Sequence, residues 1–281
     1  MGRLENFYSV HLTTFTILGI LGSFLIYFSE KEWDFVDSFF MSFSSITDTG
    51  LTTTSLESAK FSTRILVLFL LQLGSPVLWT LVPVVIRRHF LINNFNHPVC
   101  TASKYPEEDP SAPPIHLNPI PLYKYSKEYW AMSRLIVVVL AYTLFLYLFG
   151  FLCLSLRFAL SPHARYVADQ VGGWKFFTIF HVISASTNCG MSLFSSSLTP
   201  FRDDPFILIP LMILIVFGQT GFPVFLRLII INRSKTSRYR PVYTFLLHHG
   251  RSVYTHLFST VETSWLAFWW LIFFLFNLEL F

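Results

Sequence analysis

Two short turns carry the residues whose types and spacing could do chemistry. The first is Thr47-Asp48-Thr49-Gly50-Leu51, and the second, 140 residues further along the chain, is Thr187-Asn188-Cys189-Gly190-Met191. Each has one glycine, which adopts backbone conformations closed to other residues and leaves the space beside the backbone free of a side chain. Carbonyl oxygens presented by such a turn can replace the hydration shell of a monovalent cation. The ten residues of both turns are therefore the candidates for a cation-selective site made of backbone carbonyls.

The composition indicates what surrounds these turns. Of the 281 residues, 53% are hydrophobic and only 13% are charged, whereas soluble domains carry about 25% charged residues. So little charge cannot cover a surface that faces water, which excludes a soluble enzyme, a disordered regulator and a nucleic-acid binder. We therefore expect the chain to lie mostly in a lipid bilayer.

Long apolar runs provide the predicted membrane spans. A helix needs about 20 apolar residues to cross about 30 Å of hydrocarbon. Five runs meet or approach this length: Val10–Phe28, Ile65–Ile86, Leu135–Leu156, Ile207–Ile231 and Ser264–Phe281. Two amphipathic runs, Phe35–Ser45 and Trp174–Ser186, are too short to cross, and we expect them to be buried or re-entrant half-helices.

The order of these elements repeats. In each half of the chain a span precedes a half-helix, a glycine turn follows, and a second span completes the unit. Non-helical backbone at membrane depth is tolerated only inside protein or beside a water-filled cavity, and the partly negative C-terminal ends of both half-helices would face that cavity. The sequence therefore predicts an all-α integral membrane protein of tandem helix–pore-loop–helix units around a cation pore.

The predicted organisation has five segments. Residues 1–91 form the first unit, 92–127 a proline-rich cytoplasmic linker, 128–231 the second unit, 232–263 a basic cytoplasmic loop, and 264–281 the first helix of a third unit. Lys and Arg gather in the loops after the second and fourth spans, which the positive-inside rule places in the cytoplasm together with the N-terminus. The sequon Asn232-Arg233-Ser234 would then face the cytoplasm and carry no glycan.

Two features leave alternatives open. The Asp48 carboxylate either raises the local cation concentration or caps backbone N–H groups behind the turn. The second span of each unit contains a glycine and a proline close together, in Gly74-Ser75-Pro76 and Gly221-Phe222-Pro223. Proline there predicts a kink, which serves either as a gate or only for packing.

The sequence predicts no metal and no cofactor. The nine histidines do not follow the helical spacing of haem or di-iron sites, and the three cysteines show no CxxC spacing. The sequence contains no GxxxxGK[ST] phosphate loop. We therefore expect neither enzyme activity nor nucleotide binding, and transport driven by the membrane potential.

Several motifs together point to a family. They are the two turns, above all Asn188-Cys189-Gly190-Met191, the tract Leu208–Arg227, and His248-His249-Gly250-Arg251 followed by Tyr254-Thr255-His256-Leu257. In these motifs the chain resembles the Trk/HKT superfamily of K+ and Na+ transporters, most closely its eukaryotic branch. The resemblance covers roughly residues 8–90 and 130–281 and leaves out the linker.

The resemblance implies four helix–pore-loop–helix units around one pore in the plasma membrane, each with one key glycine. A serine at the first of these glycines goes with Na+ selectivity in that family. Gly50 and Gly190 therefore imply a transporter permeable to K+, with Na+ as a second cation.

Two of the four implied units can be recognised in this sequence, followed by the apolar run Ser264–Phe281. We favour a truncated version of a longer transporter, and the other interpretation is a homodimer in which two chains complete the pore. The alternative function is a non-transporting membrane protein that associates with full-length relatives.

Overall fold

The fold is helical and apolar, as the sequence predicts. The structure, a computed structural model, describes residues 2–95, 120–254 and 256–278, and this part of the chain contains no β-strand. Within these described ranges two helices are long and apolar enough to cross a membrane: His11–Ser29 within α1 (Gly2–Ser29) and Lys127–Leu160 within α7 (Ile120–Leu160). The number rises to four if each of two bent helix pairs is a single span.

The chain divides into two compact units that each combine separate stretches of sequence. The first contains residues 1–79 and 142–220, and the second contains residues 80–141 and 221–281. This division follows packing and not the sequence repeat, so the boundaries predicted for the repeated segments stay a prediction. Both glycine turns belong to the first compact unit.

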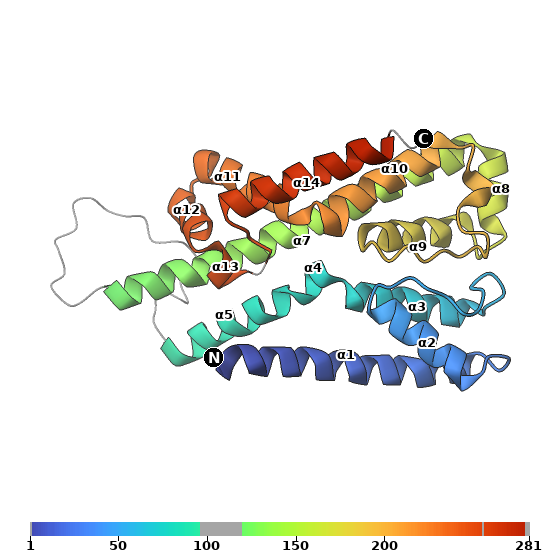
Figure 1. The fold of residues 1–281 in the computed structure, drawn as a ribbon, viewed down its shortest axis with the longest axis horizontal. Coiled ribbons are helices and arrows are strands. Elements are labelled where there is room, and N and C mark those ends of the chain that lie inside the picture. Colours follow the sequence, from blue (N-terminus) through green and yellow to red (C-terminus); the bar gives the residue numbers. More distant parts are fainter. Residues whose placement is uncertain (1, 96–119, 255, 279–281) are drawn as a thin grey trace. The chain divides into compact units, whose positions relative to one another are not determined.

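Two short helices in the first compact unit precede the two turns. They are α2 (Phe35–Ile46) and α9 (Trp174–Ser186), and they lie where the half-helices were predicted. α2 packs against α1 and α3 (Phe61–Gly74), while α9 packs against α10 (Pro205–Ile215) and α3 (Figure 1). The contact between α3 and α9 joins the two halves of the repeat.

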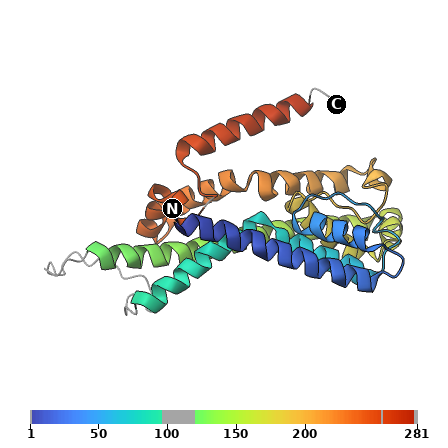
Figure 2. The ribbon, with the colours of Figure 1, turned by 60° about the horizontal axis from the view of Figure 1, so that its bottom comes forward.

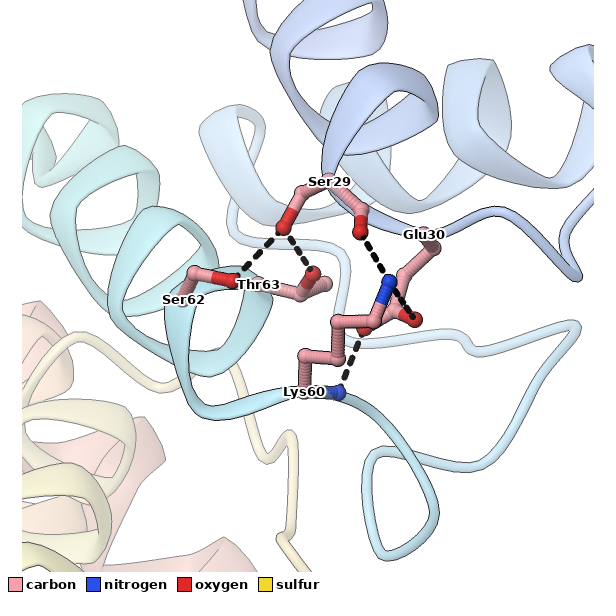
Figure 3. A network of polar contacts seen from close by, with 5 residues as sticks. All are labelled: Ser29, Glu30, Lys60, Ser62 and Thr63. Atoms are coloured by element: carbon pink, nitrogen blue, oxygen red, sulfur yellow. Dashed lines mark hydrogen bonds and ion pairs between the residues drawn. The ribbon is translucent and has the colours of Figure 1, made fainter.

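Small residues allow α1 and α2 to approach closely. The Ser42 hydroxyl donates to the Gly19 carbonyl at 2.7 Å, and a Cβ built on Gly22 would collide with the Ser42 oxygen. Helices in lipid associate through such close packing, because lipid provides no hydrophobic drive between them. A polar cluster joins the end of α1 to the start of α3. There the Lys60 ammonium donates to the Ser29 carbonyl at 2.6 Å, and the Ser29 hydroxyl contacts those of Ser62 and Thr63 (Figure 3).

Both second spans are interrupted helices. α3 ends at Gly74, and α4 (Pro76–Trp79) and α5 (Leu81–Phe95) continue the path after Ser75. The other span consists of α10, the π-helical η2 (Val216–Thr220) and α11 (Phe222–Thr236). Gly218 inside η2 has a non-helical ψ of −120°. Each interruption is followed by a proline, at Pro76 and Pro223. Proline has no N–H to donate to the preceding turn, and it therefore favours a break there.

The helices flanking the predicted linker are longer than expected. α5 continues to Phe95 and α7 begins at Ile120, so both ends of the segment 92–127 are helical, and residues 96–119 lie outside the described part. Pro121 is compatible with this start because proline in the first turn of a helix loses no hydrogen bond.

The second compact unit contains short helices where the sequence predicted a basic loop. α12 (Arg240–His248) and α13 (Gly250–Val253) lie between α11 and α14 (Thr260–Leu278), and α11 packs against both α12 and α14 (orange to red in Figure 2). The buried Arg227 of α11 donates to the Phe258 carbonyl and to the Thr260 hydroxyl at 2.5 Å. The run predicted at Ser264–Phe281 lies in α14 as far as Leu278.

Candidate functional site

The two turns have the same backbone conformation. Gly50 and Gly190 have φ values of 77° and 75°, and Asp48 and Asn188, two residues before them, have φ values of 51° and 58°. Positive φ is uncommon for residues other than glycine, although Asn and Asp are enriched there. The repeat predicted from the sequence therefore extends to individual backbone angles.

The hydrogen bonds of the two turns also match. In the first turn, the Thr49 amide donates to the Ser44 carbonyl at 3.0 Å, and the Ser44 hydroxyl donates to the Leu51 carbonyl at 2.6 Å. In the second, Cys189, Ser184 and Met191 repeat these bonds at 3.1 and 2.7 Å. Each turn is thus folded back onto the end of its own half-helix by a serine and by backbone amides.

Most carbonyl groups of the turns accept no hydrogen bond from the described residues, and the exceptions are those of Leu51 and Met191. Among the hydrogen bonds of the described residues, none is accepted by the carbonyl oxygens of residues 47–50 or 187–190. Buried backbone carbonyls are almost always paired in native proteins. The amides of residues 47–49 and 187–190 are hydrogen-bonded, so the free carbonyls beside them form a suitable environment for a cation.

The two turns lie against each other within the first compact unit. A Cβ built on Gly50 would collide with the Cys189 carbonyl oxygen, whereas a Cβ on Gly190 would meet nothing within 4 Å. The Ser45 hydroxyl lies 3.9 Å from the Met191 sulfur. The fold thus brings the first turn and the second turn together, although they are 140 residues apart in the sequence.

One glycine in each interrupted helix packs closely against the last carbonyl of a half-helix. A Cβ on Gly74 would collide with the carbonyl of Ile46, the last residue of α2, and a Cβ on Gly218 would collide with the carbonyl of Ser186, the last residue of α9. The sequence motifs paired Gly74 with Gly221, but these contacts pair Gly74 with Gly218. Close approach to a backbone carbonyl requires a missing Cβ, and the glycine–proline spacing alone did not reveal which glycine provides it.

Asn188 and Asp48 share a position in the repeat but differ in bonding. In the amide orientation that satisfies its partners, Asn188 donates to the carbonyls of Ile215 and Ala185 at 3.0 and 3.1 Å and accepts from the Thr220 hydroxyl at 2.5 Å. It therefore ties the second turn to the irregular part of its inner helix. The Asp48 carboxylate is enclosed beside the Thr187 side chain and accepts no backbone N–H bond from the described residues, which gives no support to a capping role.

Polar contacts beyond the turns join the two halves of the repeat. The Glu57 carboxylate accepts from the Ser195 amide at 3.1 Å and from its hydroxyl at 2.8 Å. The Ser195 amide, more than any other group, lowers the pKa of Glu57 below its ordinary value. Arg64 donates to the carbonyls of Val171 and Glu57, both at 2.6 Å. No local sequence pattern signals the Glu57–Ser195 and Arg64–Val171 contacts, because their partners lie 138 and 107 positions apart in the chain.

The described residues contain no group of three or more His, Cys, Asp and Glu side chains that could hold a metal ion. His181, which the sequence places alone in a half-helix, is instead hydrogen-bonded to Phe177 and Ser192. The turns therefore remain the candidate site, and backbone oxygens are its main chemistry.

Comparison with known proteins identifies the same family that the motifs suggest. Residues 123–279 match the family model TrkH, cation transport protein. The chain is 40% identical over 162 residues to a putative potassium transport protein of Dictyostelium discoideum, covering 57% of this chain and 24% of the relative. It is 33% identical over 147 residues to the low-affinity potassium transport protein of Saccharomyces cerevisiae, covering 50% of this chain and 16% of the relative.

A plant relative extends the match over most of the chain. The chain is 29% identical over 273 residues to the probable cation transporter HKT2;3 of Oryza sativa subsp. japonica, covering 92% of this chain and 52% of the relative. The chain thus spans about half the length of this relative and less of the other two. Because the family model matches more than half of the residues, the chain belongs to the TrkH family of cation transport proteins.

Proposed function

We propose that the chain provides two segments of a selectivity filter that passes K+, with Na+ as a second cation. The observation that carries this proposal is that the amides of residues 47–49 and 187–190 donate hydrogen bonds while the carbonyls of residues 47–50 and 187–190 accept none from the described residues. Carbonyl oxygens held in this way replace the water around a dehydrated cation. No cofactor takes part, and the membrane potential supplies about 2.3 kcal/mol per charge per 100 mV.

The relatives support the class of substrate. Two of them are named as potassium transport proteins and one as a probable cation transporter, and none of these names describes an enzyme. The repeat adds two tandem helix–pore-loop–helix units, at 1–91 and 128–231, to the proposal, with further filter segments from a longer chain or a second copy. The distribution of Lys and Arg adds a cytoplasmic N-terminus, and the family resemblance adds the plasma membrane.

The experiment that tests the filter places a positive charge on it. Gly190→Arg adds a positively charged side chain at a position where a Cβ meets no atom within 4 Å, next to the carbonyls proposed to hold the cation. Two unit charges about 4 Å apart repel by about 4 kcal/mol at an effective dielectric constant of about 20. We expect K+ uptake by K+-transport-deficient cells to fall more than about 100-fold, measured at equal amounts of membrane-inserted protein.

Gly173→Arg is the matched control. Gly173 also has a positive φ, 94°, and the nearest atom to its built Cβ is 4.0 Å away, but it lies at the start of α9 and outside both turns. The control therefore also places an arginine on backbone with a positive φ, but without a charge at the filter. Wild-type uptake in the Gly190→Arg protein, or an equal loss in both variants, would refute the filter assignment.

A further inference from the structure

A buried histidine lies behind the second turn. His181 of α9 is only 4% exposed, and both of its ring nitrogens have partners. Nδ1 lies 3.0 Å from the Phe177 carbonyl and Nε2 lies 3.2 Å from the Ser192 hydroxyl. A carbonyl can only accept, so Nδ1 carries the proton and Nε2 accepts from Ser192.

The Ser192 hydroxyl both donates and accepts a hydrogen bond in this arrangement. It donates to His181 and accepts from the Phe194 amide at 3.2 Å. Ser192 directly follows Met191, the last residue of the second turn, whose carbonyl is already held by Ser184. The histidine therefore connects the middle of the half-helix to the chain that leaves the turn.

Aromatic side chains enclose the imidazole, so its nitrogens have no hydrogen-bond partners among the described residues other than Phe177 and Ser192. The imidazole stacks on Phe177 with ring centroids 3.9 Å apart, and Phe180 packs against its edge at 5.6 Å. Water does not reach a ring that is this deeply buried, so breaking either bond would leave a polar atom without a partner, which is costly.

The first turn has no such connection. The positions that correspond to His181 and Ser192 through the 140-residue repeat are Met41, which is fully buried, and Thr52, which is exposed. A methionine cannot accept a comparable hydrogen bond from a hydroxyl. The histidine link is thus a difference between two turns whose backbones otherwise match.

We propose that His181 is a positioning residue that fixes the second turn through Ser192 and thereby sets how well the filter distinguishes K+ from Na+. This proposal rests on the proposed function, because discrimination depends on where the carbonyl oxygens of Thr187–Gly190 are held. His181 acts only through the position of the turn and not by contact with the cation.

The two amides provide a matched pair of variants. His181→Gln can place an oxygen near the Nε2 position, where it accepts from Ser192, whereas His181→Asn reaches only the Nδ1 position and keeps the bond to Phe177. The asparagine and glutamine side chains are both polar and no longer than that of histidine. A third variant, Ser192→Ala, removes the same link from its other end.

The direct readout is the reactivity of the Cys189 thiol, which lies in the turn and is 5% exposed. One hydrogen bond contributes about 0.5–1.5 kcal/mol, so we expect His181→Asn and Ser192→Ala each to raise the rate of Cys189 alkylation roughly two- to tenfold. His181→Gln should stay near the wild-type rate. Cys153 of α7 is the internal reference, because general loosening of the protein would change its rate as well.

The transport readout is the ratio of K+ to Na+ uptake. We expect His181→Asn and Ser192→Ala to lower it by a similar factor, and the double variant His181→Asn/Ser192→Ala to lower it no further, since both remove one link. Unchanged Cys189 reactivity in both single variants, or an equal increase at Cys153, would overturn the positioning role. Alkylation needs no transport, so this result is independent of whether the filter assignment itself holds.

Discussion

Gly50 and Gly190 occupy the same place in the two turns but have different surroundings. Both have a φ near 75°, and only at Gly50 would a Cβ collide with the neighbouring turn, at the Cys189 carbonyl. The first glycine is therefore required both by backbone conformation and by contact between the turns. The second is required by conformation alone.

This difference predicts unequal effects of the same small substitution. Alanine at either position costs about 1–2 kcal/mol from its left-handed backbone, but Gly50→Ala must also displace the Cys189 carbonyl. Overpacking of this kind costs about 1–3 kcal/mol, so we expect Gly50→Ala to raise the KM for K+ uptake about tenfold more than Gly190→Ala. The measurement is uptake kinetics in K+-transport-deficient cells, and equal KM values would argue against contact between the turns.

At the scale of elements, contacts beyond the turns hold the two halves of the repeat together. Glu57 follows the first turn and Ser195 follows the second, and the carboxylate of Glu57 accepts both polar groups of Ser195. Arg64 adds bonds from α3 to the segment before α9. These bonds act together with the packing of α3 against α9 and with an apolar core that both halves share, and all three position the two turns.

The Glu57 link predicts a stability that depends on pH. Its pKa is lowered in the folded protein, chiefly by the Ser195 amide, so the ionised form stabilises the fold above the ordinary glutamate pKa of about 4.3. This contribution is lost as the pH falls through the lower, folded-state value. We therefore expect Glu57→Gln to melt at a lower temperature than wild type at pH 7, with the gap closing below about pH 4.

The control for this prediction is Glu32→Gln, a change of the same type at an exposed glutamate in the loop after α1. It should melt like wild type at both pH values. A gap between Glu57→Gln and wild type that persists undiminished in acid would show that the carboxylate charge does not stabilise the fold.

At the scale of the whole molecule, the distribution of Lys and Arg predicts which loops face the cytoplasm. The loops after the second and fourth spans are basic, so Asn232 should be cytoplasmic and Ser197, beyond the second turn, should lie on the opposite side. Ser197 is exposed and has a φ of 58°. Asparagine is favoured at such an angle.

Ser197→Asn therefore tests the orientation with little strain, because Leu198 and Thr199 complete a sequon. We expect this variant, made in a eukaryotic secretory system, to gain one glycan that an endoglycosidase removes, as measured by mass. The wild-type chain, with its native sequon at Asn232, should carry none. A glycan on Asn232 would reverse the predicted orientation.

The sequence by itself determined the environment, the order of elements and the family. Low charge and long apolar runs require lipid as solvent, and the Ser/Thr/Gly turns at 47–51 and 187–191 identify the candidate site because each signal is local in the chain. The interruptions near Pro76 and Pro223 are local in the same sense, since proline breaks a helix wherever it lies.

Only the tertiary structure decided which distant residues support the site. It placed Gly74 against the Ile46 carbonyl and Gly218 against the Ser186 carbonyl. It also joined Glu57 to Ser195 and placed His181 against Ser192. Each of these contacts depends on the path of the chain between its partners, and a single glycine, glutamate or histidine carries no pattern that specifies its partner. Hydrophobic periodicity encodes which face of an element is buried, and the fold determines what that face meets.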